Sequence, residues 1–585
     1  MSVARLFFPL FFSVLLCVFP LLVVAQDSEE AAKTKQHRQT LLLEQIVADI
    51  PNMKLGENRA LVYARLGNIV WKSDRKRAHK FFQNAASELV NAQISAEADK
   101  KNSGFQYDLI SGQPARPQIL QTIAACDAEL ALEYLYKTRP EAITKAFSMA
   151  SVKNSKISNH SNNYSYLVQN EDNLEQSFVR LAADQNPERA IKLLKESLKK
   201  GFSEQTLGLL KKLHEKDAEA ADEIASEVVG KLIGINFNPQ NAAVYQQLNV
   251  TTNFLTEFTR KKAETEKAVK FNESQMRGLA DKLISFYLQQ NNGRAYFNAY
   301  AIIPIAEKLA PSSVESLKKL QRNSLYTGFD RGYEFDPEVN KILGGEATAE
   351  QLLIEAKKFP VSSRRQIYQT AANKFAQQGD LNRATEILKD NFDDDALEQE
   401  IHNLNSQFVY SLSSAGKFTE AERVIDGFPE NLRVNALTNL ANAIYRKNPE
   451  ENKSYAVAVL GKARSLISAK PEDTTEMSNL MQIISAYSAI EPVEAFRLFE
   501  PLIQQINELS EAAVIINGFQ RNSNIKQGEF VITSGNSWGI YGAEFSVLSK
   551  LSTDDFERVL SLIDNFSRRE MRVSLKLQLA ENTLN

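Results

Sequence analysis

The sequence is poor in the residues that interrupt helices. Its 585 residues include only 23 glycines and 17 prolines, roughly 4% and 3% against about 7% and 5% in typical proteins. This shortage predicts long helices. A hydrophobic content of 43% with 24% charged residues excludes wholesale disorder. A chain of this length exceeds one compact core, so we expect either several domains or a solenoid.

Cysteine is nearly absent, since the chain has only Cys17 and Cys126. Cys17 lies in segment 1–25, which has the pattern of a signal peptide: Arg5 precedes the apolar run Leu6–Val24. Cleavage after this segment would leave Cys126 alone and exclude an internal disulfide. We therefore expect an exported bacterial envelope protein, periplasmic or extracellular. The alternative is an uncleaved segment that anchors the chain in the membrane.

An excess of charge of one sign is also missing, since the formal net charge is −3. The basic clusters are scattered and flanked by acids, which disfavours nucleic acid as a partner. The five histidines are dispersed without a pair at ligand spacing, and the sequence has no glycine-rich phosphate loop. We therefore predict no metal site and no cofactor.

The stretch from Ile367 to Ile425 contains one helical hairpin written twice. In each copy, apolar residues recur at the spacing of a buried helix face, a glycine follows, and a second apolar stripe begins. Gly379 and Gly416 stand just past the end of the first helix, where glycine adopts a left-handed conformation without a Cβ penalty. The matching offsets predict a stacked repeat.

A shorter pattern recurs along the whole chain: a polar turn, then an alanine, then apolar residues three and four positions later. Alanine at a helix crossing lets the two helices of a hairpin approach closely, and a larger side chain there would cost about 1 to 3 kcal/mol. The structural repeat positions predicted in this way are Ala78, Ala131, Ala190, Ala221, Ala384, Ala421, Ala456 and Ala495.

The turn glycines, the apolar residues Leu381 and Phe418 two positions later, and the repeat alanines resemble the core of the tetratricopeptide-like family of helical hairpins. The resemblance covers about residues 366–500. It implies a right-handed superhelix with a concave binding face. The chain is also similar to uncharacterised exported helical-repeat proteins of bacteria.

The predicted fold class is all-α: an αα-hairpin repeat solenoid, a tetratricopeptide-like superhelix, with one small β-hairpin insertion near the C-terminus. In that insertion we expect strands at 529–533 and 538–541 around a turn at 534–537. The predicted division is a signal peptide at 1–25, a flexible lead-in at 26–40, an irregular N-terminal α-solenoid at 41–322, an aromatic loop insertion at 323–346, tetratricopeptide-like repeats at 347–522, the β-hairpin insertion at 523–544 and C-terminal capping helices at 545–585.

Two of these insertions carry aromatic side chains, which bury a large area on contact for little entropy. We interpret them as candidate binding residues for a partner. The alternative is that they fold back and cover the solenoid. They are Tyr326, Phe329, Tyr333, Phe335, Trp538 and Tyr541.

Two catalytic patterns deserve comparison with known enzymes. Gly535–Gly539 matches G-x-S-x-G around Ser537, but an α/β-hydrolase needs a later histidine and the last one is His402. Glu273 and Ser274 are similar to the catalytic pair of soluble lytic transglycosylases, whose other motifs are missing. The sequence therefore predicts no catalytic residue.

Taken together, these patterns lead us to expect an exported scaffold that binds protein or peptide partners in the bacterial cell envelope. Membrane contact is expected only if the N-terminal segment stays uncleaved. The alternative is an exported enzyme that acts on polysaccharide or peptidoglycan and is built on an α-helical toroid or superhelix.

Overall fold

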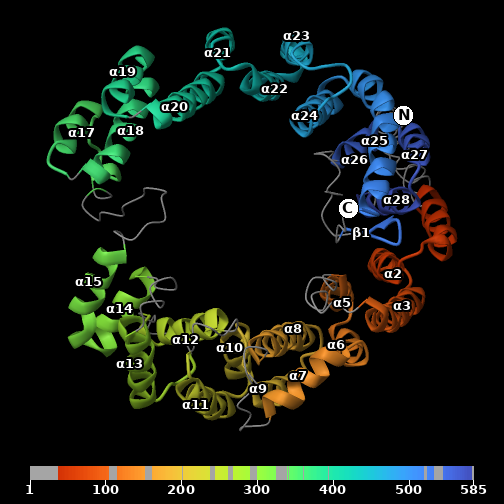
Figure 1. Ribbon diagram of the computed structural model, residues 1–585, viewed down its shortest axis with the longest axis vertical. Coiled ribbons are helices and arrows are strands. Elements are labelled where there is room, and N and C mark those ends of the chain that lie inside the picture. The colour runs from red at the N-terminus through yellow and green to blue at the C-terminus, as the bar shows by residue number, and fades with distance from the viewer. Residues whose placement is uncertain are drawn as a thin grey trace, which may run out of the picture. The chain divides into compact units, whose positions relative to one another are not determined.

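The protein is helical apart from one small hairpin, in the residues described by the computed structural model (Figure 1). These residues are 37–103, 115–151, 161–200, 202–237, 244–260, 268–289, 299–324, 339, 342–359, 361–392, 394–519, 524–532 and 545–582. Its contacts divide the chain into two compact units. Unit 1 is Met1–Phe105, Pro114–Ile119 and Arg464–Asn585, and unit 2 is Gln106–Gln113 and Leu120–Ala463.

Unit 2 consists of antiparallel helix pairs. Its helices are α6 (Ala128–Lys137), α7 (Glu141–Ser151), α8 (Ser161–Gln185), α9 (Ala190–Lys200), α10 (Thr206–Lys216), α11 (Ala218–Gly234), α12 (Val244–Thr259), α13 (Glu273–Gln289), α14 (Ala299–Leu309), η3 (Pro311–Ser313), α15 (Val314–Ser324), α17 (Ala349–Ala356), α18 (Val361–Gln377), α19 (Leu381–Asn391), α20 (Asp394–Ala415), α21 (Phe418–Ile425) and α22 (Glu430–Lys447). Two helices contribute to both units: α5 (Ala115–Cys126) and α23 (Pro449–Ser465).

Unit 1 joins the two ends of the described chain. A helix at 37–49 and the short η1 (Ile50–Asn52) come first. The other elements are α2 (Gly56–Val70), α3 (Arg75–Ser103), α24 (Thr474–Ile490), α25 (Pro492–Asn517), β1 (Ile525–Lys526), β2 (Glu529–Phe530), α26 (Ser546–Asp554), α27 (Phe556–Asp564) and α28 (Arg569–Asn582).

Polar N-cap side chains start several of these helices. The side chains of Asp127, Asp217 and Asp380 each accept a hydrogen bond from the backbone N–H three residues on. Thr348 and Gln351 form a reciprocal capping box at the start of α17. Each cap satisfies a backbone donor that the helix itself leaves unpaired. The polar turns that precede Ala131, Ala221 and Ala384 therefore begin the helices of these alanines.

The repeat alanines lie where helices pack closely. The exposed fraction of each side chain is 0%, for Ala78, Ala131, Ala190, Ala221, Ala384, Ala421, Ala456 and Ala495. In unit 2, Ala384 belongs to an apolar cluster that also includes Phe375 and Leu404. This cluster runs from α17 through α18 and α19 to α20, so that each helix is buried partly by the next one along the chain.

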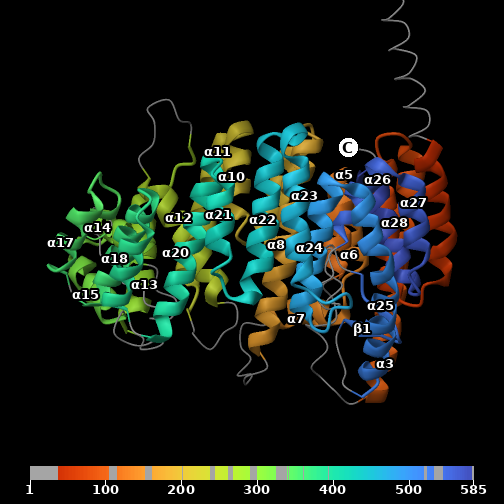
Figure 2. The same cartoon turned by 90° about the horizontal axis from the view of Figure 1, so that it is seen from above.

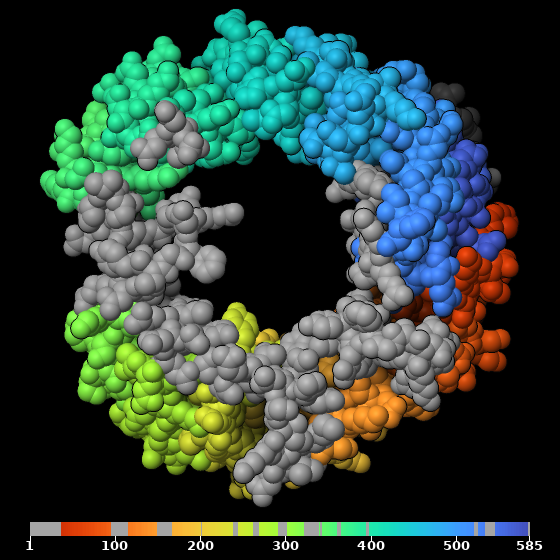
Figure 3. All heavy atoms as spheres, viewed as in Figure 1, coloured from red at the N-terminus to blue at the C-terminus, as the bar shows by residue number. Residues whose placement is uncertain are grey.

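In unit 1, α2 packs against both α3 and α28. Figure 3 shows the red N-terminal segment and the blue C-terminal segment in contact. Arg65 of α2 forms a bidentate ion pair with Glu581 of α28, with Nε–Oε1 and Nη2–Oε2 distances of 2.7 and 2.6 Å. Lys526 of β1 pairs with Glu57 of α2 at 2.8 Å. The helices that follow residue 545 were expected to cap a free end. They meet the start of the chain instead.

Asn58 joins α2 to the β hairpin. Its side chain is fully buried, and its Nδ2 donates to the carbonyl oxygen of Phe530 at 2.8 Å. Its Oδ1 accepts from the backbone N–H of Ile532, also at 2.8 Å. The side-chain amide thus pairs with β2 as a neighbouring strand would. The same Nδ2 also donates to Oε1 of Glu529 at 2.7 Å.

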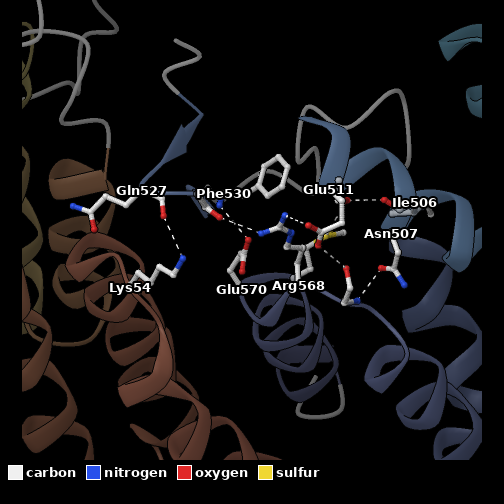
Figure 4. A network of polar contacts seen from close by, with 12 residues as sticks. Lys54, Ile506, Asn507, Glu511, Gln527, Phe530, Arg568 and Glu570 are labelled. Carbon is white, nitrogen blue, oxygen red and sulfur yellow. Dashed lines mark hydrogen bonds and ion pairs between the residues drawn. The ribbon is translucent and has the colours of Figure 1, made fainter. Parts of the chain in front are cut away.

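Two buried glutamates lie beside this amide. Glu529 accepts from the backbone N–H groups of Lys54 (2.6 Å) and Leu55 (3.3 Å). Glu570 of α28 accepts from the N–H of Phe530 at 3.1 Å, and Figure 4 shows its position between the hairpin and Arg568. Burial raises the pKa of Glu570, and the charge of Glu529 adds to this effect. Both carboxylates are 5% exposed.

The structure shows a hairpin that the sequence did not predict. Glu529 and Phe530 pair with Lys526 and Ile525, and the turn lies at residues 527–528. Gln527 and Gly528 both have positive φ, 50° and 73°. Two such residues make the tight turn whose twist matches a β hairpin. The turn therefore precedes the 529 strand. The predicted partner strand at 538–541 lies outside the described residues.

Two predicted boundaries also differ from the structure. Helix already includes residues 37–40, which were assigned to a flexible lead-in. The two compact units divide near residues 119 and 463, whereas the predicted divisions fall at 322, 347 and 523. The reason is that residues after 463 pack with the N-terminal helices. Residues 1–25, the predicted signal peptide, lie outside the described part.

The raised pKa of Glu570 predicts that removing its charge stabilises unit 1. The folded protein binds this proton more tightly than the unfolded chain, where the ordinary pKa is 4.5. The penalty for the buried charge is therefore present above the folded pKa and disappears as the pH falls to 4.5. We expect Glu570→Gln to raise stability on the order of 1 kcal/mol at pH 7.5 and to have little effect at pH 4.5.

Urea denaturation at the two pH values measures this difference. Glu581→Gln is the matched control, because it weakens the ion pair with Arg65. It should lower stability at pH 7.5, by about 0.5 to 1 kcal/mol. A loss of stability in Glu570→Gln at pH 7.5 would contradict the prediction.

Candidate functional site

The first helices of three successive hairpins in unit 2 form one layer. Helix α18 contacts α20, and α20 contacts α22. Helices α19 and α21 pack on the other side as the second helices of the pairs. Figure 2 shows α20, α21 and α22 side by side. Arg365 of α18 links two helices of the layer, because its guanidinium lies 3.2 Å from Glu400 of α20 and over the ring of Phe392.

The hairpin turns that create this layer depend on glycine. Gly379 and Gly416 have φ of +93° and +77°. In each turn the glycine N–H donates to the carbonyl three residues back, and the next N–H donates to the carbonyl five residues back. This is the Schellman arrangement, which satisfies the last carbonyls of the first helix. The second helix then begins at once, antiparallel to the first.

The free face of α20 is uncharged. Five residues recur at the spacing of a single helix face and are all exposed: Gln399, Asn403, Gln407, Tyr410 and Ser414. Nε2 of Gln399 donates to Oδ1 of Asn403 at 3.1 Å. Tyr410 is 76% exposed. The opposite side of the helix carries Leu404 and Leu412, which are buried against the neighbouring helices.

Helices α22 and α18 repeat this composition. On α22 the free face bears Asn431, Asn435 and Asn439, which are exposed, then the half-buried Asn442, and it ends with Arg446. Nδ2 of Asn439 donates to Oδ1 of Asn435 at 2.8 Å. On α18 the corresponding residues are Gln366, Gln369, Asn373 and Gln377. We call the residues of these three stripes the amide-lined face.

The second helices have a different surface. The exposed residues of α19 include Arg383, Glu386, Lys389 and Asp390, and those of α21 include Glu420 and Arg423. Arg383 pairs with Glu386 at 3.0 Å. Amides thus predominate on the free stripes of the first helices and charged residues on the exposed surfaces of α19 and α21, although the first helices also carry exposed Arg365, Glu398 and Glu430. The free stripes of the first helices and the exposed surfaces of the second helices therefore differ in composition.

Side-chain amides can donate and accept hydrogen bonds at the same time, but they do not titrate. The amides of the amide-lined face are therefore suited to hydrogen bonding with a polar chain. No cluster of histidine, cysteine, aspartate or glutamate able to hold a metal occurs among the described residues. In the same part of the chain, no helix combines the length and apolarity that a membrane crossing requires.

The candidate residues chosen from sequence do not coincide with this face. Tyr326, Phe329, Tyr333, Phe335, Trp538 and Tyr541 all lie outside the described residues. The predicted binding residues are aromatic side chains of the two insertions, so the prediction did not include the amide-lined face. The polar residues of the same helices carry the signal, since Asn431, Asn435, Asn439 and Asn442 recur at helical spacing.

Comparisons with known proteins show no family for this chain. No family model matches the chain, and no curated protein does. One similar solved structure is described as a "Circular tandem repeat protein with novel repeat topology and enhanced subunit contact surfaces". It is 13% identical over 92% of this chain and 98% of the other, with a TM-score of 0.15.

The turn that aligns the layer should be sensitive to a single methyl group at Gly379. A Cβ there would meet no atom within 4 Å, but the φ of +93° is unfavourable for any L side chain. We expect Gly379→Ala to destabilise unit 2 by about 1 to 2 kcal/mol. Urea denaturation followed by circular dichroism measures this loss.

Gly230→Ala is the matched control for the added methyl group. Gly230 lies inside α11, and its added Cβ also meets nothing within 4 Å. Alanine should stabilise that helix by about 0.5 to 1 kcal/mol. Equal effects of the two variants would show that backbone conformation at the hairpin turn is unimportant.

Proposed function

We propose that this protein is a tetratricopeptide-like scaffold that binds an extended segment of a protein partner on the amide-lined face. The observation that carries the proposal is the row of amide-rich stripes on α18, α20 and α22, which the exposed surfaces of α19 and α21 do not repeat. A peptide backbone presents one N–H and one C=O in each residue. Amide side chains can pair with both, whatever the sequence of the partner.

The size of the face suits a short peptide. Packed helices lie about 8 to 10 Å apart, so three helices offer roughly 20 Å between the first and third axes. An extended chain rises about 3.3 Å per residue, so some six residues cross this distance. Tyr410, which is 76% exposed, supplies an aromatic surface in the middle of the face. Such residues contribute strongly to binding because they bury much area at low entropic cost.

Helix stability does not explain the amides. Asparagine is a poor helix former, and alanine at the same exposed position would favour the helix by roughly 0.5 kcal/mol. Helix α22 nevertheless carries Asn435 and Asn439 near its centre. The hydrogen bond that the structure shows for the side chain of Asn439 is the one to Asn435. The residues fit a binding role better than a stabilising one.

The proposal can be tested with the full chain and an unbiased library of displayed peptides. A selected peptide should lose at least about tenfold in affinity when Asn403, Gln407, Asn435 and Asn439 are all changed to alanine, because each lost hydrogen bond costs about 0.5 to 1.5 kcal/mol. This variant should melt no lower than the wild type. The matched control changes Arg383, Glu386, Glu420 and Arg423 to alanine and should bind normally.

A glycan array run in parallel separates the peptide scaffold from the polysaccharide-acting alternative. Amides and an exposed tyrosine also suit sugars, so saccharide binding that requires the same four amides would replace our proposal. Selection of no peptide, or equal binding by the two quadruple variants, would also overturn it.

We further propose that the chain is exported to the bacterial cell envelope. The support is the N-terminal pattern of Arg5 followed by the apolar run Leu6–Val24. After expression in a bacterial host, we expect the protein in the periplasmic fraction with a new N-terminus near Gln26. Recovery of the chain in the cytoplasm with residues 1–25 intact, as shown by N-terminal sequencing, would contradict export.

A further inference from the structure

A small cavity lies in unit 2 between α8, the connection from α9 to α10, and α12. It is lined by Gln169 and Asn173 of α8, by Phe202, Ser203 and Glu204, and by Gln246 and Val250 of α12. None of these residues belongs to the amide-lined face. The cavity volume is about 10 Å³, roughly the space that one water molecule or one ammonium group needs.

The cavity walls are held by hydrogen bonds. Oε1 of Gln176 on α8 accepts from the hydroxyls of Ser203 and Thr206, at 2.8 Å in both cases. The backbone N–H of Ser203 donates to Oγ1 of Thr206 at 2.7 Å. On the other side, Nε2 of Gln246 donates to Oδ1 of Asn170 at 3.1 Å and links α12 to α8. These contacts position the lining residues without any ligand.

Two acceptors in this cavity have no donor among the described residues. Oε1 of Gln169 and Oδ1 of Asn173 are buried atoms without a hydrogen-bond partner. The two residues are one helical turn apart on α8, so both oxygens face the same space. A buried acceptor left unpaired costs about 1 to 3 kcal/mol. A group that donates one hydrogen bond to each of the two oxygens would remove this cost for both.

The charge and aromatic character of the cavity favour a cationic donor. Glu204 is exposed at the edge of the cavity and supplies a carboxylate. Phe202 is also among the lining residues, and aromatic residues attract cations. An ammonium group has three N–H donors and no acceptor. It therefore matches two amide oxygens and one carboxylate, whereas an anion would be repelled.

We propose that this cavity binds a single primary ammonium group, such as the end of a lysine side chain. The planar guanidinium of arginine is wider than the space and presents five donors in a rigid fork. Selectivity for lysine over arginine therefore follows from size. The site does not depend on the amide-lined face, so it can exist whether or not that face binds peptides.

The experiment uses the full chain and two pairs of probes. Butylammonium is compared with butanol, which has the same length and no charge. Ac-Ala-Ala-Lys-Ala-Ala-NH₂ is compared with peptides that carry norleucine or arginine in place of lysine. Isothermal titration calorimetry gives the affinities. We expect saturable binding of butylammonium and of the lysine peptide, and at least about tenfold weaker binding of the other three, a difference of 1.4 kcal/mol.

Variants of the two free acceptors assign the binding to the cavity. Gln169→Leu and Asn173→Leu should each weaken butylammonium binding about tenfold. Gln169→Glu should tighten it several-fold, because it adds a charge to the site, and a gain of affinity cannot come from a failure to fold. Asn435→Leu, the same kind of change on an exposed helix face, is the control and should leave binding unchanged.

Several results would overturn the proposal. They are the absence of saturable butylammonium binding, equal binding of butanol or of the arginine peptide, or unchanged affinity in all three cavity variants. A crystal structure grown with butylammonium that shows only a water molecule between Gln169 and Asn173 would do the same. If butylammonium binds and the lysine peptide does not, the cavity accepts small free amines only. The proposal of a primary ammonium site then holds without the lysine side chain as its ligand.

Discussion

A helical hairpin cannot bury its apolar surface alone, so each hairpin of this protein must pack against another helix or hairpin. Inside a row of hairpins the next pair supplies the cover, as α20 does for α18 and α19. The ends of a row usually need a polar outer face. Here α2 has buried side chains in succession at Ala60, Leu61 and Val62, so it is covered on more than one side. Helix α28 provides that second cover, and α2 provides it for α28 in return.

The contact between the two chain ends combines this apolar cover with a buried polar network. A buried carboxylate is costly unless it is hydrogen bonded. Glu529 accepts three hydrogen bonds, from the backbone of Lys54 and Leu55 and from the side chain of Asn58. Asn58 in turn satisfies the strand residues Phe530 and Ile532. A shift of one residue between α2 and the hairpin would break all of these bonds together, so the network defines the register of the contact.

Uncharged amides recur at the two places to which our proposals assign binding. On α18, α20 and α22 they form stripes that range from half-buried to exposed, and on α8 and α12 they line a small cavity. The physical difference is solvent access. On the exposed face the amides can bond to each other and to water. A bound peptide would replace these hydrogen bonds, so its binding free energy would come mainly from shape complementarity. In the cavity two oxygens lack a donor, so a single matched group gains strongly there.

The sequence by itself determined the helical class and the internal geometry of the hairpins, because both depend on local chemistry. Apolar spacing, N-cap side chains such as Asp380 and the turn glycines Gly379 and Gly416 act over a few residues, and each is visible in the chain. The amide stripe of α22 was visible for the same reason, although apolar patterns alone did not reveal it. The turn at 527–528 was not predicted, because one strand can pair with a segment on either side of it.

Only the tertiary structure decided which distant segments meet. The pairing of Asn58 with Phe530 and Ile532 joins residues more than 400 positions apart. Its chemistry is that of any buried amide, so the residue alone does not specify its partner. The free oxygens of Gln169 and Asn173 are likewise a property of the packing of α8 against α12, since an amide on a helix becomes a binding group only when its neighbours leave it buried and unpaired.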